Sequence, residues 1–318
     1  MTIYLSDEAI ACTLPLARAI DCVRMAFSDL ASGQAQNAVR NRMASGSAVM
    51  NVMWASSQGS GAMAVKSYVT AGHGVTHGSA LSLAIYSTET GELLALMEAN
   101  ILGRIRTAAA TVIATRMMAN ANPATLSIYG TGFQAEYQVE ALLSSVNTLT
   151  RVYVVGRNAE KRDAFVEKLS TGARDVEFLS ADPRTAAASA DIIVTATNSR
   201  EPLFDATWLR PGVHINAVGS NAPEKAEISR ATLERANLIV VDDLAVAQQE
   251  CGDLIVNQWS MDRMNTLGEL ILGRAKTRTA TDDITLFESQ GLALQDLMCG
   301  LAVTKEAEKM GLGIKLTG

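Results

Sequence analysis

A glycine-rich turn near the middle of the chain constrains the fold more than any other feature. The run Gly130-Thr131-Gly132-Phe133-Gln134-Ala135 fits the pattern G-x-G-x-x-G/A, and it lies between an apolar strand-like segment (126–129) and a helix-like segment (135–143). The first glycine permits a tight turn, the second lets the backbone approach a pyrophosphate, and a small third residue keeps helix and strand close. The helix N-terminus then meets the phosphate charge. We therefore expect these six residues to bind a dinucleotide, the alternative being a glycine-rich turn in an ordinary α/β unit.

Short apolar runs alternate with helical stretches from residue 124 onward. The runs occupy residues 126–129, 152–155, 176–179, 191–197, 214–218 and 238–241. Most of them lack a polar face, which is typical of parallel strands covered by helices on both sides. Six such strands predict a doubly wound parallel sheet, a Rossmann domain, over residues 116–295.

The first hundred residues have a different pattern. A helical stretch (14–30) precedes strand-like segments, and a helix is expected over 103–120. The strand-like segments are 48–54, 62–69, 81–87 and 93–97. A further helix is expected after Gly291, and we expect it to pack on the N-terminal region. Residues 1–115 and 296–318 would then form a second, discontinuous α+β domain for substrate binding and dimerisation, and 318 residues are enough for two domains.

Composition and charge exclude several classes of protein. The net charge is −6 and no run of Lys or Arg forms a basic stripe, which argues against a nucleic-acid partner. Four cysteines lie far apart without a CxxC pair, which favours a reduced cytosolic protein over a zinc ribbon. The apolar runs are too short to span a bilayer, and the N-terminal residues do not resemble a signal peptide. We expect a cytoplasmic protein with no membrane partner.

The residues after the second Rossmann strand bear on the choice between NAD and NADP. An acidic side chain there would bind the ribose 2′-hydroxyl and repel a 2′-phosphate, but the chain has Gly156-Arg157-Asn158. Arg157 suits a 2′-phosphate, although it also fits a solvated loop cation. The sequence therefore favours NADP(H) and leaves NAD(H) open. Asn158 and Thr197, which ends the fourth strand, are also expected to contact the cofactor.

Three cations before the Rossmann segment predict a site for an anion: Arg42, Lys66 and Arg106. Lys66 lies in an apolar strand-like segment, where an ammonium is costly without a charged partner. Arg106 begins an otherwise uncharged helical run and should be paired as well. Arginine binds a carboxylate through two parallel hydrogen bonds, and a helix N-terminus adds positive field. Each residue alone fits a structural ion pair, but together they predict a pocket for an anionic substrate.

Two of the three histidines, His73 and His77, have the i, i+4 spacing that binds a metal on a helix. The glycines around them favour a loop instead, and no third ligand is evident, so no metal is expected. Because this loop follows the strand with Lys66, the two imidazoles are expected to line the substrate pocket. The third histidine, His214, opens a sheet strand and is interpreted as structural.

Three aspartates near the end of the expected Rossmann segment are interpreted as loop or cap carboxylates. They are Asp242, Asp243 and Asp253. The first two follow the sixth strand at the edge of the sheet where Rossmann enzymes bind their ligands.

Five segments in combination resemble the ornithine cyclodeaminase/mu-crystallin family. They are 105–110 (IRTAAA), 130–135 (GTGFQA), 273–275 (GRA), 283–289 (DITLFES) and 291–296 (GLALQD). Members of this family have a Rossmann domain and a substrate domain that also forms a homodimer. They include cyclodeaminases, alanine dehydrogenases and imine reductases. The resemblance implies that Arg42, Lys66 and Arg106 hold the substrate carboxylate, that Lys66 also polarises the reacting carbon–nitrogen bond, and that Thr107 lies near the cofactor phosphates.

One departure from the family pattern concerns Asn221. Cyclodeaminases and archaeal alanine dehydrogenases have an aspartate at this position, where a cyclodeaminase must take protons from substrate amines. Asparagine does not accept a proton at neutral pH, whereas an amide suffices to orient an imine while the proton arrives from solvent or Lys66. The alternative is that Asn221 is only a loop residue and another acid serves.

These observations lead to an expected activity, NAD(P)H-dependent reduction of a small α-imino acid to the amino acid, reversible in principle. The cations would neutralise the carboxylate and keep the imine carbon electrophilic. Arg40 and the two loop histidines fit a dicarboxylic imine such as iminosuccinate, and cyclic imines such as pyrroline-2-carboxylate remain open. Two other classes are a lyase that uses bound NAD and a non-catalytic NADPH-binding protein like mu-crystallin, and the retained cations argue against the latter.

Overall fold

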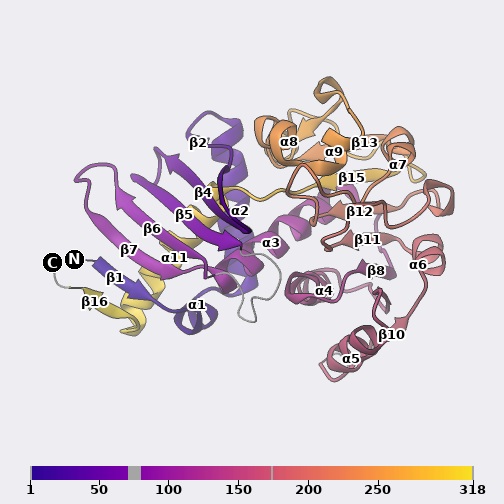
Figure 1. Ribbon diagram of the computed structural model, residues 1–318, viewed down its shortest axis with the longest axis horizontal. Helices are drawn as coiled ribbons and strands as arrows, with labels where there is room; N and C mark the ends of the chain where they lie inside the picture. The colour runs from indigo at the N-terminus through magenta and orange to yellow at the C-terminus, as the bar shows by residue number, and fades with distance from the viewer. Residues whose placement is uncertain (1, 71–79, 173–174, 317–318) are drawn as a thin grey trace. The chain divides into compact units, whose positions relative to one another are not determined.

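The computed structural model describes residues 2–70, 80–172 and 175–316, and His73 and His77 lie outside them (Figure 1). The chain divides into two compact units, Met1–Ala109 with Gly291–Gly318, and Ala110–Gln290. The domain boundaries expected from the sequence, after residues 115 and 295, lie a few residues later in the chain than the boundaries between these two units. The division at residue 290 keeps the whole C-terminal helix in the first unit.

The first unit contains a mixed sheet with the strand order β16-β1-β7-β6-β5-β4-β2, and β3 also pairs with β4. Its strands are β1 (Thr2–Leu5), β2 (Ala35–Asn37), β3 (Asn41–Ser45), β4 (Ala48–Ser57), β5 (Ala62–Thr70), β6 (Ser82–Ser87), β7 (Leu93–Glu98) and β16 (Ile314–Leu316). The pair β1–β7 is parallel and the other pairs are antiparallel. The four expected strands are confirmed as β4 to β7, whereas β1, β2, β3 and β16 were not expected.

Helices cover one face of this sheet. They are α1 (Asp7–Thr13), α2 (Leu16–Ala31) and α11 (Ala293–Met310). Helix α11 packs against α2 and against β4, β5 and β6, and Figure 1 shows it crossing behind these strands. A Cβ atom on Gly300 of α11 would lie 2.7 Å from Ile85 Cδ1, so this glycine permits the close approach of helix and sheet.

The second unit has a Rossmann sheet in the order β10-β9-β8-β11-β12-β15-β13-β14. Its strands are β8 (Thr125–Tyr129), β9 (Arg151–Val155), β10 (Glu177–Ser180), β11 (Ile192–Thr195), β12 (His214–Ala217), β13 (Leu238–Val241), β14 (Asn265–Thr266) and β15 (Thr285–Glu288). All neighbouring strands are parallel. The chain adds β9 and β10 on one side of β8 and then crosses to the other side of β8 to form β11, so the strand order switches between β8 and β11. The six expected strands are confirmed. Two strands were not expected: β15, which lies between β12 and β13, and β14, at the edge beside β13.

The helices of the second unit connect these strands. They are α4 (Phe133–Ser145), α5 (Ala159–Ser170), α6 (Pro183–Ser189), α7 (Arg230–Arg235), α8 (Leu244–Glu250), α9 (Gly252–Val256) and α10 (Leu267–Ile271), with 3₁₀ turns η1 (Ala206–Trp208) and η2 (Met261–Arg263). Helix α3 (Asn100–Met118) contributes residues to both units. Among the residues that the structure describes, no helix has the length and apolarity needed to cross a membrane.

His214 is a buried structural residue of this sheet, as the sequence indicated. Its Nδ1 lies 2.9 Å from Thr285 Oγ1, and its Nε2 lies 3.2 Å from Asn216 Oδ1. Burial, with a smaller effect from Arg278, lowers the pKa of His214 to about 3. The imidazole is therefore neutral and links β12 to β15.

Candidate functional site

The turn after β8 has the geometry that the glycine motif predicts. Gly130 has a φ of +120°, and a Cβ atom there would lie 2.5 Å from the carbonyl oxygen of Ala196, at the end of β11. Gly132 is the N-cap of α4, and Ala135 is completely buried in the first turn of that helix. Glycine is thus required at the first position, and a small residue at the last lets α4 pack against the sheet.

Three strand ends meet at this turn. A Cβ atom on Gly156, just after β9, would lie 3.0 Å from Thr131 Cγ2. On the other side, a Cβ atom on Gly130 would lie 3.4 Å from Thr197 Cγ2. The structure therefore brings together the turn, the segment that carries Arg157, and Thr197. Their contacts with a cofactor stay a prediction.

The remaining residues predicted to bind the cofactor differ in exposure. Phe133 is exposed, whereas Thr131 and Gln134 are half-buried. Arg157 and Asn158 are exposed, and Asn158 Oδ1 accepts a hydrogen bond from the Lys161 amide at 2.8 Å, which caps α5. Asn158 therefore has a structural role at the helix terminus, in addition to the role predicted for it.

Glu227 is a buried residue that the sequence analysis missed, and it joins the ends of β11 and β12. Its Oε1 accepts hydrogen bonds from the amide and the hydroxyl of Thr197, both at 2.7 Å. Its Oε2 accepts from the Thr195 hydroxyl at 2.8 Å and from the Gly219 amide at 2.9 Å. Burial raises the pKa of Glu227 to about 7, although the hydrogen bonds from Thr197 and Thr195 oppose the shift. A loop carboxylate thus fixes two strand ends of the Rossmann sheet.

The interpretation as loop or cap carboxylates holds for Asp242, in the loop between β13 and α8, and for Asp243, which caps α8 through the Val246 amide at 2.9 Å. It is wrong for Asp253, which lies in helix α9. Asp242 and Asp253 are buried. Asp253 Oδ1 accepts from the Glu227 amide at 2.6 Å and the Ile228 amide at 2.8 Å, and burial raises the pKa of Asp253 to about 6. It therefore holds the backbone that positions Glu227. Sequence reasoning missed the burial of Asp253, although this acid is followed directly by the apolar residues Leu254, Ile255 and Val256 of α9.

Asn221 lies just after β12, two residues beyond Gly219. Its Oδ1 accepts a hydrogen bond from Lys225 Nζ at 2.9 Å, and the same ammonium donates to the Gly219 carbonyl at 3.3 Å. This orients the amide at the carboxyl end of the strand, where a Rossmann enzyme binds its ligand. Its role toward an imine stays a prediction.

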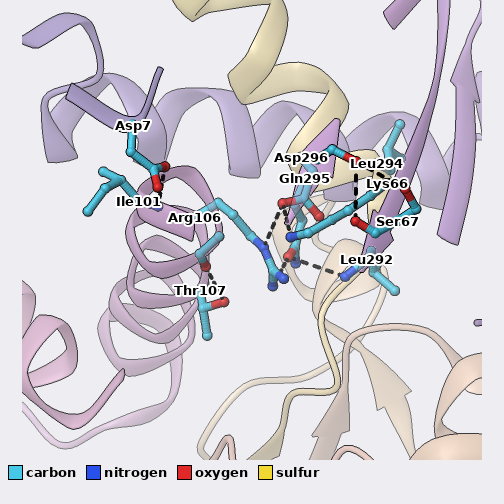
Figure 2. A network of polar contacts seen from close by, with 12 residues as sticks. Asp7, Lys66, Ser67, Ile101, Arg106, Thr107, Leu292, Leu294, Gln295 and Asp296 are labelled. Atoms are coloured by element: carbon cyan, nitrogen blue, oxygen red, sulfur yellow. Dashed lines mark hydrogen bonds and ion pairs between the residues drawn. The ribbon is translucent and has the colours of Figure 1, made fainter. Parts of the chain in front are cut away.

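In the first unit, Lys66 and Arg106 meet on one buried carboxylate, that of Asp296 (Figure 2). Lys66 Nζ lies 2.7 Å and Arg106 Nε lies 3.2 Å from the same oxygen, Asp296 Oδ1. Arg106 also donates from Nη1 to Gln295 Oε1 at 3.1 Å. The expectation that both cations have a partner is confirmed. Asp296, which supplies it, was missed, although it is a lone acid in an apolar segment, the same signal that singled out Lys66.

Burial and the neighbouring charges act in opposite directions on the two most buried members of this cluster, Lys66 and Asp296. Burial lowers the pKa of Lys66 to about 8, the charge of Asp296 raises it, and Arg106 and Arg40 lower it further. Burial alone would raise the pKa of Asp296, but Arg106 and Lys66 outweigh it and lower that pKa. Lys66 is therefore mainly an ammonium at neutral pH, and Asp296 is a carboxylate.

The other residues predicted for this site lie in different surroundings. Arg42 is on β3, a strand exposed throughout, and its backbone lies opposite that of Asn51 on the neighbouring strand β4. Arg40, by contrast, is buried and close enough to lower the pKa of Lys66. Thr107 is half-buried on α3, and its hydroxyl donates to the Gly103 carbonyl at 2.8 Å. The structure thus brings Lys66, Arg106 and Arg40 together and leaves the role of Arg42 as a prediction.

Comparison with known proteins identifies the family. The model of the ornithine cyclodeaminase/mu-crystallin family matches residues 2–310. The chain belongs to this family. A Δ1-pyrroline-2-carboxylate reductase of Bacillus cereus is 36% identical over 233 residues, which are 72% of this chain and 71% of that protein.

Two solved structures share the fold over nearly the whole chain. A Thermococcus litoralis Δ1-pyrroline-2-carboxylate reductase, solved with NADH and L-proline, is 27% identical with a TM-score of 0.93 and covers 99% of this chain and 100% of its own. An archaeal alanine dehydrogenase, solved as a dimer with bound NAD, is 28% identical with the same TM-score and covers 99% of each chain.

The substitution Glu227→Gln tests how far the Rossmann edge depends on one carboxylate. An amide NH₂ would face donor groups of Thr197 or Gly219, leaving at least one buried donor without an acceptor. We expect the free energy of unfolding to fall by about 1–3 kcal/mol. Urea denaturation followed by circular dichroism measures this change. Glu224→Gln, at an exposed position in the same loop, should leave it unchanged, and equal stability of the two variants would contradict the role of Glu227.

Proposed function

We propose that this chain reduces a small α-imino acid to the amino acid with NAD(P)H. The observation that carries the proposal is the pair of buried cations, Lys66 and Arg106, on a single carboxylate. Two positive charges and one negative charge leave one positive charge in excess, and a buried excess charge favours binding of an anion. The carboxylate of an imino acid supplies one such charge. The activities named for the Bacillus and Thermococcus relatives support the same substrate class.

The residues around the glycine turn fit a nicotinamide dinucleotide. Gly130 leaves no room for a side chain, and α4 begins immediately after Gly132, so backbone amides and a helix N-terminus are available for phosphate. When bound, the cofactor supplies a hydride to the imine carbon. Arg157 is exposed just after β9 and supports binding of a 2′-phosphate, hence NADP(H). The Thermococcus relative was solved with NADH, so both cofactors belong in the test.

Each site residue has a distinct part in the proposed reaction. Arg106 and Lys66 bind the substrate carboxylate. Lys66 also keeps N–H donors beside the imine nitrogen, since an ammonium has three and only one is directed at Asp296 Oδ1. The amide of Asn221 orients the imine without acting as a base, which supports reduction over a cyclodeaminase reaction.

We infer that the protein is a homodimer that buries the outer face of the first unit's sheet. Alternate residues of β4 and β5 on that face are exposed and apolar: Met50, Trp54, Met63, Val65 and Val69. Trp54 and Val65 are cross-strand neighbours, so these side chains form one patch. An apolar patch of this kind is typical of a protein–protein interface. The dimeric alanine dehydrogenase relative supports the inference.

The first experiment follows the absorbance of NADH or NADPH with purified protein. The substrates are pyrroline-2-carboxylate and other preformed cyclic imines, and pyruvate, glyoxylate or oxaloacetate with ammonium. We expect oxidation that requires an imino acid, formed in place or supplied. Release of ammonia from ornithine or lysine without net change in the nicotinamide would instead show a lyase. Binding of cofactor with no turnover on any substrate would also overturn the proposal.

Arg106→Leu tests the placement of the substrate carboxylate. A charged hydrogen bond to a buried anion contributes roughly 2–5 kcal/mol, so kcat/KM should fall by about 30-fold or more. Arg116→Leu, an exposed position on the same helix α3, is the matched control and should be nearly neutral. An unchanged kcat/KM in a folded Arg106→Leu protein would show that the carboxylate binds elsewhere.

Val65→Lys tests the dimer. A lysine in the middle of the apolar patch would place two like charges in a self-complementary interface. We expect light scattering to give twice the chain mass for the natural sequence and the mass of one chain for the variant. Met25→Lys, at an exposed position on α2, should remain dimeric. A natural protein of single-chain mass would remove the inference.

A further inference from the structure

Asp296 is the most buried member of its cluster with Lys66 and Arg106. It is completely buried, and its Oδ1 accepts from both Lys66 and Arg106 (Figure 2). Its second oxygen, Oδ2, has no hydrogen-bond partner among the described residues. A buried carboxylate with one oxygen that accepts no hydrogen bond is costly, and the two cations on the other oxygen offset that cost.

The surrounding chain is built to accept this arrangement. Asp296 is in the first turn of α11, where the helix field stabilises a negative charge. A Cβ atom on Gly291 would lie 3.0 Å from Arg106 Nη2 and closer still to Nη1. A Cβ atom on Gly103 would lie 3.2 Å from Lys66 Nζ. The two glycines therefore leave room for the two cationic heads beside the carboxylate.

We propose that Asp296 is a positioning residue for the proposed reduction, which holds Lys66 in place and keeps it charged while Lys66 binds the imino acid. This role rests on the proposed function. Asp296 acts through Lys66 and does not itself contact the substrate. The charged groups that act on Lys66 from neighbouring segments are Asp296 on α11, Arg106 on α3 and Arg40 before β3. Asp296 is the single anion among them, so its removal leaves only repulsion.

The charge state of Lys66 sets the expected pH dependence. Because the pKa of Lys66 is about 8, kcat/KM of the natural protein should decline as the pH rises above that value and the ammonium loses its proton. Without Asp296, two arginines and burial all disfavour the ammonium. The alkaline decline should then begin at a lower pH.

The test uses Asp296→Asn, with Glu308→Gln on the exposed side of the same helix as the control. We expect the alkaline limb of kcat/KM to move at least one pH unit lower in Asp296→Asn and to stay in place in the control. At pH 8 the loss should be about fivefold or more, and it should be clearly smaller at pH 6. A loss by one constant factor at every pH would show a purely structural role and overturn the proposal.

A second measurement needs no turnover. The ¹³Cε resonance of Lys66, assigned by comparison with Lys66→Arg, reports its titration directly in lysine-labelled protein. Its midpoint should be at least one unit lower in Asp296→Asn than in the natural protein, and an unchanged midpoint would overturn the proposal. If the natural protein turns over no imino acid, the proposed function fails, while this titration still decides whether Asp296 controls Lys66.

Asp296→Glu covers the case in which Asp296→Asn does not fold. It keeps the charge, but the extra methylene moves the carboxylate out of register with the two cations. We expect a smaller shift of the Lys66 midpoint in the same direction and a lower kcat. A Lys66 titration and a kcat both equal to those of the natural protein would show that the position of this carboxylate does not matter.

Discussion

The first unit depends on one buried ionic contact, the sharing of Asp296 Oδ1 by Lys66 and Arg106. Removing one partner of a buried ion pair costs about 3–5 kcal/mol, because the other charge is left in a medium that does not solvate it. Strand β5, helix α3 and helix α11 each contribute one member. The contact therefore fixes three segments that are far apart in sequence. Since it holds more positive than negative charge, the same contact also favours an anionic ligand.

In the second unit, buried carboxylates stabilise the ends of the parallel strands at one edge of the sheet. Loops that follow such strands have backbone amides and hydroxyls that need acceptors. Glu227 supplies these acceptors for Thr195, Thr197 and Gly219, and Asp253 in turn holds the backbone of Glu227. Two acids with raised pKa values thus shape the edge at which the glycine turn lies. Their effect is on backbone geometry, whereas Asp296 acts on the charge of a side chain.

Sequence patterns predicted two parts of the structure: the recurring apolar strands of the Rossmann sheet, and the charged side chains that lie in apolar segments. The apolar runs gave the six Rossmann strands, and Lys66 and Arg106 were singled out because a charge in an apolar segment needs a partner. Asp296 met the same criterion but was considered only as part of a motif. Glu227 had no such signal, because a carboxylate in a polar loop is usually solvated. Asp253 was interpreted as a loop or cap residue, although it lies in helix α9 beside apolar residues. Strand β15 was missed since its segment was likewise considered only as a motif.

The short strands β1, β2, β3 and β16 were missed for another reason. Each has three to five residues, too few for an alternating pattern to stand out from its neighbours. Their positions are fixed by pairing with strands distant in sequence, as in the antiparallel contact of β16 with β1. Such contacts depend on the whole sheet, and no local pattern reports them.

The place of Asp296 in the chain has a consequence for biosynthesis. It is 230 residues from Lys66 and 190 residues from Arg106, and the entire Rossmann sheet lies between. A nascent chain leaving the ribosome contains both cations and the whole nucleotide-binding sheet before the residue that pairs the cations has been made. A prematurely terminated chain that ends after β15 would contain the glycine turn and the Rossmann strands, but it would lack the ionic cluster.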